Sequence, residues 1–161
     1  FKAPWGALLK TMSLLASIVL LGGVGTVTCL ATRHLPSVVF WSSFLPAPAI
    51  LLACACFTIR GYAIAPDAIL VRRLFWATRL PRAGLTSARF EPDVMRGSLR
   101  TWGNGGLFSI SGYYRNKLLG SYRAYVTDPH QTVVLQYAGR TVVLSPAPPE
   151  EFVRELGLNP A

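Results

Sequence analysis

The chain has 161 residues, of which 52% are hydrophobic and only 14% are charged, with a formal net charge of +9. About a quarter of the residues in a typical soluble domain are charged, so this composition argues against an ordinary soluble protein. All seven acidic residues lie at or after Asp67, and the only Lys and Arg residues before Arg60 are Lys2, Lys10 and Arg33. The sequence therefore divides into an almost uncharged first third and a conventional polar remainder. Its length is sufficient for one domain plus an accessory element.

Two uncharged stretches in the first third have the length of membrane spans. They cover residues 11–31 and 35–57, which are 21 and 23 residues. Roughly 20 apolar residues cross a hydrocarbon core of about 30 Å. Helices of this length in a soluble protein normally show a polar face, and these stretches show none. We therefore expect a two-helix transmembrane hairpin over residues 1–57. A cleaved signal peptide is the alternative for the first stretch, because a basic flank precedes it and small residues follow it.

The positive charges beside these stretches predict their orientation. Positively charged flanks stay on the cytoplasmic side of a membrane. The connector between the stretches carries a single Arg, whereas the outer flanks carry Lys2, Lys10, Arg60, Arg72 and Arg73. We therefore expect a multi-pass protein of the cell inner (plasma) membrane with both termini in the cytoplasm. Cleavage of the first stretch would leave the C-terminal part on the same side.

Residues 58–161 form the second region, in which the spacing of apolar residues becomes twofold, as is typical of strands. Strands are expected at residues 59–64, 68–75, 76–80, 85–90, near 108–110, and at 122–127, 132–137 and 140–145. A Pro-rich segment ends the last strand, and a helix follows in which Phe152, Val153 and Leu156 share an apolar face. Gly157 ends this helix. About seven antiparallel strands at regular spacing, followed by a helix, predict a small barrel that the helix caps.

Several short motifs in this region form a recognisable pattern. The most specific are Gly103-Asn104-Gly105-Gly106-Leu107-Phe108 and an ending made of Leu144-Ser145-Pro146 and Pro149-Glu150-Glu151-Phe152; between them lie Gly112-Tyr113-Tyr114-Arg115-Asn116, Leu119-Gly120 and Tyr125-Val126-Thr127. Over residues 60–157 this pattern resembles the bacterial PH (pleckstrin-homology-like) domain families of membrane proteins, in which two N-terminal spans are also common. The resemblance implies a PH-like barrel and a membrane-linked setting, and it implies no catalytic residues.

The motifs that usually indicate chemistry have simpler explanations here. The β-rich region holds one histidine, His130, and no His, Cys and Asp cluster has metal-ligand spacing. Glu91-Pro92-Asp93 is interpreted as solvated charges around a turn. The glycine run at residues 103–106 lacks the following Lys-Ser/Thr of a phosphate loop, so we expect a turn or bulge with positive φ. The sequence thus predicts a protein that is not an enzyme and has no cofactor or metal.

The excess of Lys and Arg over acidic residues is the feature of the sequence that points to a function. All but three of the 16 Lys and Arg residues lie after residue 57. A domain beside an anionic leaflet gains about 1 kcal/mol for each Lys or Arg held near it. Residues 113–119 mix aromatic, basic and apolar side chains, which predicts a loop in the headgroup zone. The candidate lipid-binding or partner-binding residues are Arg72, Arg73, Arg79, Arg82, Tyr113, Tyr114, Arg115, Lys117 and Arg123.

Two functions follow from these features. The first is a non-enzymatic, membrane-anchored PH-like module that mediates protein interaction or self-assembly into a homo-oligomer at the cytoplasmic membrane face, with exposed strand edges as the docking surface. The second is recognition of anionic lipid headgroups by the basic loops. Nucleic acid is not expected as a partner, because the adjacent bilayer already accounts for the positive charge. The sequence leaves the identity of the partner and the oligomeric state open.

Overall fold

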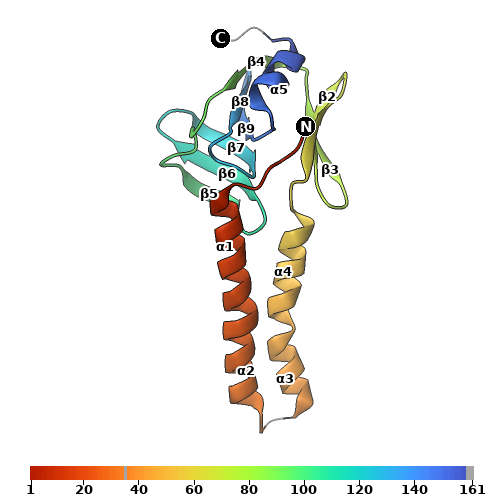
Figure 1. The fold of residues 1–161 in the computed structure, drawn as a ribbon, viewed down its shortest axis with the longest axis vertical. Coiled ribbons are helices and arrows are strands. Elements are labelled where there is room, and N and C mark those ends of the chain that lie inside the picture. Colours follow the sequence, from red (N-terminus) through yellow and green to blue (C-terminus); the bar gives the residue numbers. More distant parts are fainter. Residues whose placement is uncertain (35, 159–161) are drawn as a thin grey trace.

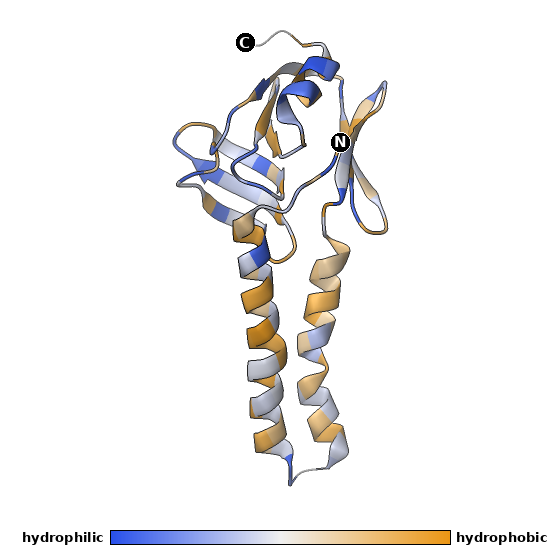
Figure 2. Cartoon of the chain, viewed as in Figure 1, coloured by the Kyte–Doolittle hydropathy of each residue, from blue (hydrophilic) through white to orange (hydrophobic). Residues whose placement is uncertain are grey.

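The computed structural model describes residues 1–34 and 36–158. Two helical rods stand side by side below a β domain (Figure 1). The first rod contains α1 (Ala7–Ile18), a π-helical segment (Val19–Gly23) and α2 (Val24–Thr32), and the second contains α3 (Ser37–Phe44) and α4 (Pro46–Cys56). Both rods, of 26 and 20 residues, are long and apolar enough to cross a membrane. Figure 2 shows orange, apolar residues along the length of both rods, with few hydrophilic ones between them.

The second rod is divided at Leu45, and the sequence explains why. Pro46 and Pro48 follow this residue, and neither has the N–H group that would bond to the preceding helical turn. The two rods approach closely at Gly25, where an added Cβ atom would lie 3.3 Å from the ring of Phe44. A residue without a side chain therefore allows the helices to pack, as is common between membrane helices.

Two sheets make up the β domain within the described residues. The three-stranded sheet has the order β1 (Gly61–Ile64), β2 (Ala68–Arg72), β3 (Ala77–Pro81). The six-stranded sheet has the order β4 (Leu85–Phe90), β8 (Val133–Tyr137), β9 (Thr141–Leu144), β7 (Gly120–Val126), β6 (Ile110–Asn116), β5 (Leu99–Gly105). Neighbouring strands are antiparallel except for β7 and β9, which are parallel.

This arrangement corrects the predicted barrel of about seven antiparallel strands. The two sheets do not close into a barrel, nine strands are present in the described part of the chain, and one pair is parallel. β5 was not expected because its residues are exposed on both faces apart from Asn104, so apolar and polar residues do not alternate along it. β6 extends to Asn116, so most of the loop expected at residues 113–119 is strand.

Apolar side chains gather on both faces of the six-stranded sheet. The first cluster joins the two sheets to the C-terminal helix α5 (Pro149–Leu156) and includes Tyr62, Leu144 and Phe152. The second lies on the opposite face and includes Leu9 and Val126. The helix expected at the C-terminal end is thus present, and Gly157 ends it in the left-handed conformation with φ of 65°. It covers the core between the sheets.

Both rods are fixed to the β domain. In the first, the Gly6 N–H donates a hydrogen bond to the Thr127 carbonyl oxygen at 3.0 Å. About two turns further, the Ser13 hydroxyl accepts from the Phe108 N–H at 2.9 Å and lies 3.2 Å from the Gly106 carbonyl oxygen. The second rod is followed by the buried residue Ile59, and β1 begins two residues later at Gly61. The β domain therefore sits on the rods at two points, with the β5–β6 loop beside α1 (Figure 1).

The buried hydroxyl of Tyr62 makes the folding stability of the chain depend on pH in the alkaline range. Its hydroxyl is buried, donates to the Tyr125 carbonyl oxygen at 2.7 Å and lies 3.3 Å from Ser145 Oγ. Burial raises the pKa of Tyr62 to about 12. An unfolded Tyr ionises near pH 10, so the contribution of the Tyr62 hydroxyl to the free energy of unfolding is complete below about pH 10. It falls by about 3 kcal/mol as the pH rises to about 12.

Urea unfolding of the detergent-solubilised chain at several alkaline pH values checks this prediction. Tyr62→Phe has no phenol to ionise at this position, so its stability should decline less between pH 10 and pH 12 than that of the natural chain. An equally steep decline in both proteins would show that Tyr62 is not the group responsible.

Candidate functional site

A cavity of about 400 Å³ lies where the two sheets meet the end of α4. We call it the inter-sheet pocket. Its walls come from the last turn of the second rod, the β2–β3 turn and one face of β5, β6 and β7; they include Phe57, Arg73, Trp102, Tyr113, Arg123 and Tyr125. No acidic residue lines this cavity within the described part of the chain.

The floor of the inter-sheet pocket is set by strand register. Tyr113 on β6 lies between Trp102 on β5 and Arg123 on β7, so these three side chains form one row across the sheet. In the same way, Ser111 lies opposite Tyr125. Side chains alternate between the two faces of a strand, so Arg123 and Tyr125, two residues apart, point to the same face. An aromatic and basic surface results.

Arg73 forms the opposite wall, at the end of β2. Its guanidinium donates a hydrogen bond to the carbonyl oxygen of Phe57, and its Nε lies 3.4 Å from Thr78 Oγ1. A cation is favourable at this position because the C-terminal end of α4 carries partial negative charge. Burial lowers the pKa of Arg73, but an arginine stays charged in proteins. Arg73 therefore joins the second rod to the three-stranded sheet.

Both arginines of the pocket stack on the ring of Tyr125. The ring centroid lies 5.5 Å from Cζ of Arg73 and 5.1 Å from Cζ of Arg123, and Arg123 also lies 5.3 Å from the ring of Tyr113. Tyr125 is only 2% exposed, and its hydroxyl finds no hydrogen-bond partner among the described residues. Burial raises the pKa of Tyr125, so the hydroxyl stays neutral and can donate a hydrogen bond.

An apolar turn lies beside this pocket on the side of the rods. The β2–β3 turn contains Leu74, Phe75 and Trp76, which we call the aromatic turn. Figure 1 shows it descending next to the top of α4, where the Trp76 ring centroid lies 5.1 Å from that of Phe57. Phe75 is 75% exposed. Large apolar side chains are thus presented to the surroundings at the level where the second rod ends.

Of the nine candidate residues, the structure brings Arg73, Tyr113 and Arg123 together in the inter-sheet pocket. Arg72, the last residue of β2, does not line this pocket; it lines a different hollow beside Arg60, which Arg73 also borders. Arg115 and Lys117 are exposed near the β6–β7 turn and do not line the inter-sheet pocket. Binding by any of these residues stays a prediction.

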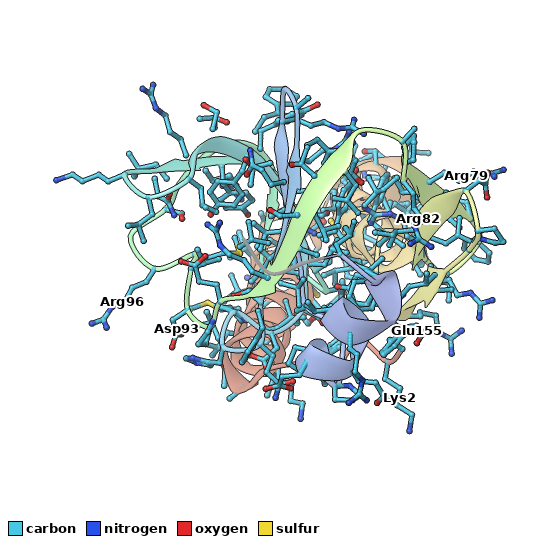
Figure 3. The ribbon with its side chains drawn as sticks, turned by 90° about the horizontal axis from the view of Figure 1, so that it is seen from above. Lys2, Arg79, Arg82, Asp93, Arg96 and Glu155 are labelled. Carbon is cyan, nitrogen blue, oxygen red and sulfur yellow. The ribbon has the colours of Figure 1, made fainter. Side chains whose placement is uncertain are left out.

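The other candidates have structural partners. Arg79 pairs with Asp67 at 2.7 Å, and Arg82 donates to the Leu156 carbonyl oxygen at 2.9 Å. Both lie together at one edge of the domain, far from Asp93 and Arg96 at the opposite edge (Figure 3). Tyr114 is buried and stacks on Tyr122 with ring centroids 6.0 Å apart. The basic candidates are therefore distributed over several faces of the domain.

Residues 60–158, more than half of the chain, match the sequence model of the family described as Bacterial PH domain. The chain belongs to the bacterial PH domain family. This confirms the resemblance seen over residues 60–157 of the sequence. No curated protein and no solved structure matches the chain. PH domains are generally non-catalytic modules, and membership of this family indicates a module that interacts with proteins or lipids.

A second cavity, of about 680 Å³, lies on the other face of the six-stranded sheet of the PH domain. At its rim, Nδ1 of His130 lies 2.6 Å from Oδ1 of Asp93, and both side chains are largely exposed. In the part of the chain that the structure describes, no three His, Cys, Asp or Glu residues are grouped to hold a metal ion. The His130–Asp93 pair therefore has the features of an exposed side-chain hydrogen bond.

Some residues of the inter-sheet pocket were not among the candidates. Tyr125 could have been found, because a residue two positions from Arg123 in a strand shares its face. Nothing in the sequence marked Phe57 as a pocket residue, since it ends an uninterrupted apolar stretch.

The His130–Asp93 pair, which lies outside this pocket, joins residues 37 positions apart, and nothing local in the sequence connects them.

Proposed function

We propose that this chain is a non-enzymatic, membrane-anchored PH-domain module. In this proposal the two rods span the inner (plasma) membrane, both termini are cytoplasmic, and the PH domain lies against the bilayer and contacts anionic lipid headgroups. The observation that carries the proposal is the position of the aromatic turn, which extends from the PH domain on the side of the rods (Figure 1).

The lengths of the rods support this arrangement. The second rod has 20 residues, and 20 helical residues extend about 30 Å, the thickness of the hydrocarbon core. With this rod across the membrane, Phe57 and the adjacent Trp76 lie at the membrane–water interface. Tryptophan is enriched at that depth because its ring is apolar while its N–H remains hydrated. The exposed ring of Phe75 would be buried in the same layer.

Basic residues at the same level add an electrostatic contribution. Lys10 is exposed one turn into α1, and Arg60 is exposed just after the second rod. Each basic side chain near an anionic leaflet contributes about 1 kcal/mol. The long stems of Lys and Arg also let the charge reach the headgroups while the chain stays apolar. The aromatic turn and these charges together favour lipid contact over the protein interaction that the sequence placed first.

A depth measurement tests the proposal. Cys29, Cys54 and Cys56 are replaced by Ser, a nitroxide label is attached at Phe75→Cys, and the full chain is reconstituted in anionic vesicles. We expect the label at position 75 to be accessible to oxygen and shielded from a water-soluble nickel complex. A label at Ala138→Cys, in the exposed β8–β9 turn, should show the reverse. Equal accessibility to nickel at both positions would exclude a membrane-resting PH domain.

A second candidate function, protein interaction or self-assembly, is favoured by β5. This strand is an edge of the six-stranded sheet, and Leu99 and Trp102 on it are strongly exposed. An open edge can add a strand from a partner or from a second copy. Under this alternative, Leu99→Cys should form crosslinked products in native membranes, while Ala138→Cys should not. Absence of crosslinked species at Leu99→Cys would count against β5 as the docking edge.

A further inference from the structure

We infer that the inter-sheet pocket is a binding site for a phosphate-class oxyanion, which the guanidiniums of Arg73 and Arg123 and the hydroxyl of Tyr125 would hold. Where the phosphate belongs to a lipid headgroup, this inference rests on the proposed position of the PH domain at the bilayer. A soluble phosphate ester has the same binding chemistry and needs no such position.

The charge of the pocket is the first argument. Arg73 and Arg123 face one cavity and stack on one ring, and no carboxylate lines that cavity within the described residues. The three ion pairs found in that part of the chain involve neither arginine. Two cations in one cavity repel each other, and an anion between them would convert this repulsion into attraction. Arginine is suited to this role because its planar fork matches the oxygens of a phosphate.

The hydroxyl of Tyr125 is the second argument. Buried hydroxyl groups are nearly always hydrogen-bonded. The equally buried hydroxyl of Tyr62 follows this rule, with the Tyr125 carbonyl oxygen and Ser145 Oγ as partners. The Tyr125 hydroxyl has no partner in the described residues, although the Tyr125 ring stacks against two guanidiniums. A neutral phenol is a donor, and a phosphate oxygen in the pocket is the acceptor that would satisfy it.

Preorganisation is the third argument. Arg73 is already held by the Phe57 carbonyl oxygen and by Thr78, and Arg123 is held by two aromatic rings. Binding an anion would therefore immobilise little that is now free, which favours affinity. The contact between Arg73 and the end of α4 also has a purely structural role. Arg123 lines the pocket without such a hydrogen bond to α4, and Tyr125→Phe keeps the buried ring of Tyr125 in the core. The test therefore depends on these two residues.

The position of the pocket suits a lipid phosphate. Cys54 and Phe57 form its wall on the side of the rods, and under the proposed orientation these residues lie next to the headgroup layer. The cavity of about 400 Å³ is larger than a phosphate group needs, so a glycerol or a similar substituent also has room.

The test uses the full chain in nanodiscs of phosphatidylcholine. In the soluble arm, inorganic phosphate and glycerol 3-phosphate are titrated; in the lipid arm, phosphatidic acid replaces part of the phosphatidylcholine. The readout is the shift of the unfolding midpoint with ligand concentration. We expect Arg123→Gln to weaken binding about tenfold, because a charge-assisted hydrogen bond is lost. Tyr125→Phe keeps the ring on which the arginines stack and should weaken binding severalfold.

Two matched controls come from the β8–β9 region. Arg140 stacks on Tyr137 at 4.7 Å, and the Tyr137 hydroxyl also lacks a partner in the described residues, but this pair lies outside the inter-sheet pocket. Arg140→Gln and Tyr137→Phe therefore repeat the two changes elsewhere and should bind like the natural chain. An equal loss of binding in these controls, or no ligand-dependent shift in either arm, would overturn the inference.

The two arms also identify the source of the phosphate. A shift with phosphatidic acid alone assigns a lipid headgroup, and a shift with the soluble ligands assigns a phosphate that does not depend on membrane contact. The depth of the label at position 75 does not involve Arg123 or Tyr125. An inserted label combined with no ligand-dependent shift would thus refute this inference and leave the proposed function intact.

Discussion

Replacement of Gly112 by Ala is expected to lower the free energy of unfolding of the PH domain by about 3 to 5 kcal/mol, from backbone strain and overpacking together. Gly112 lies on β6 with φ of 151°, a conformation that residues with a side chain rarely adopt. A Cβ atom there would overlap the carbonyl oxygen of Trp102 and lie 2.8 Å from Cα of Gly103 on β5. The backbone of β5 cannot move away without losing its pairing with β6.

Urea unfolding followed by tryptophan fluorescence measures this effect. Gly139→Ala is the matched control, because Gly139 has no positive φ and no atom lies within 4 Å of an added Cβ. Gly120→Ala separates the two causes, since its φ of 67° is strained but space is available. The order of stability should be Gly139→Ala, then Gly120→Ala, then Gly112→Ala. Equal midpoints for Gly112→Ala and Gly139→Ala would mean that β5 and β6 do not pair in this register.

Phe152→Ala should destabilise the PH domain by a similar amount, about 3 to 5 kcal/mol, because a large buried ring leaves a cavity behind. Phe152 on α5 is fully buried, and its ring packs edge-on against Phe1 at 5.0 Å and against Tyr62 at 6.4 Å between centroids. These contacts attach α5 to the core between the sheets. Loss of the ring is therefore expected to loosen the helix as well as the core.

Phe75→Ala provides the control for this substitution, since it makes the same chemical change at an exposed site. In detergent we expect its stability to stay within about 0.5 kcal/mol of that of the natural chain. Far-ultraviolet circular dichroism with urea unfolding compares the two variants. A Phe152→Ala protein as stable as Phe75→Ala would contradict the placement of α5 on the core.

Features that depend on neighbouring residues could be predicted from the sequence. The rods follow from uninterrupted apolar length, and the division at Leu45 follows from two prolines. The C-terminal helix follows from Pro149 at its start, an apolar stripe and Gly157 at its end. The positive φ values of Gly103 and Gly106 match the expected turn or bulge in the glycine run. In each case the physical cause lies within a few residues of its effect.

Features that depend on distant pairing could not be predicted. The parallel contact between β7 and β9 skips β8, and an unclosed pair of sheets has the same local alternation as a barrel. Arg73 and Arg123 share a pocket because strand register brings them to one ring, although 50 positions separate them. β5 carries no alternation at all. Composition identified many basic candidates, but only the three-dimensional arrangement separates the two arginines that line the pocket from those on other faces of the domain.

The proposed function requires that the rods span the membrane and that the PH domain lies in the cytoplasm. Labelling with a membrane-impermeant maleimide tests it most directly, in a chain whose Cys29, Cys54 and Cys56 are replaced by Ser. Single cysteines are placed at His34→Cys, in the connector between the rods, and at Ala138→Cys, in the PH domain. We expect position 34 to react in intact cells and position 138 to react only after lysis. Labelling of position 138 in intact cells would contradict it.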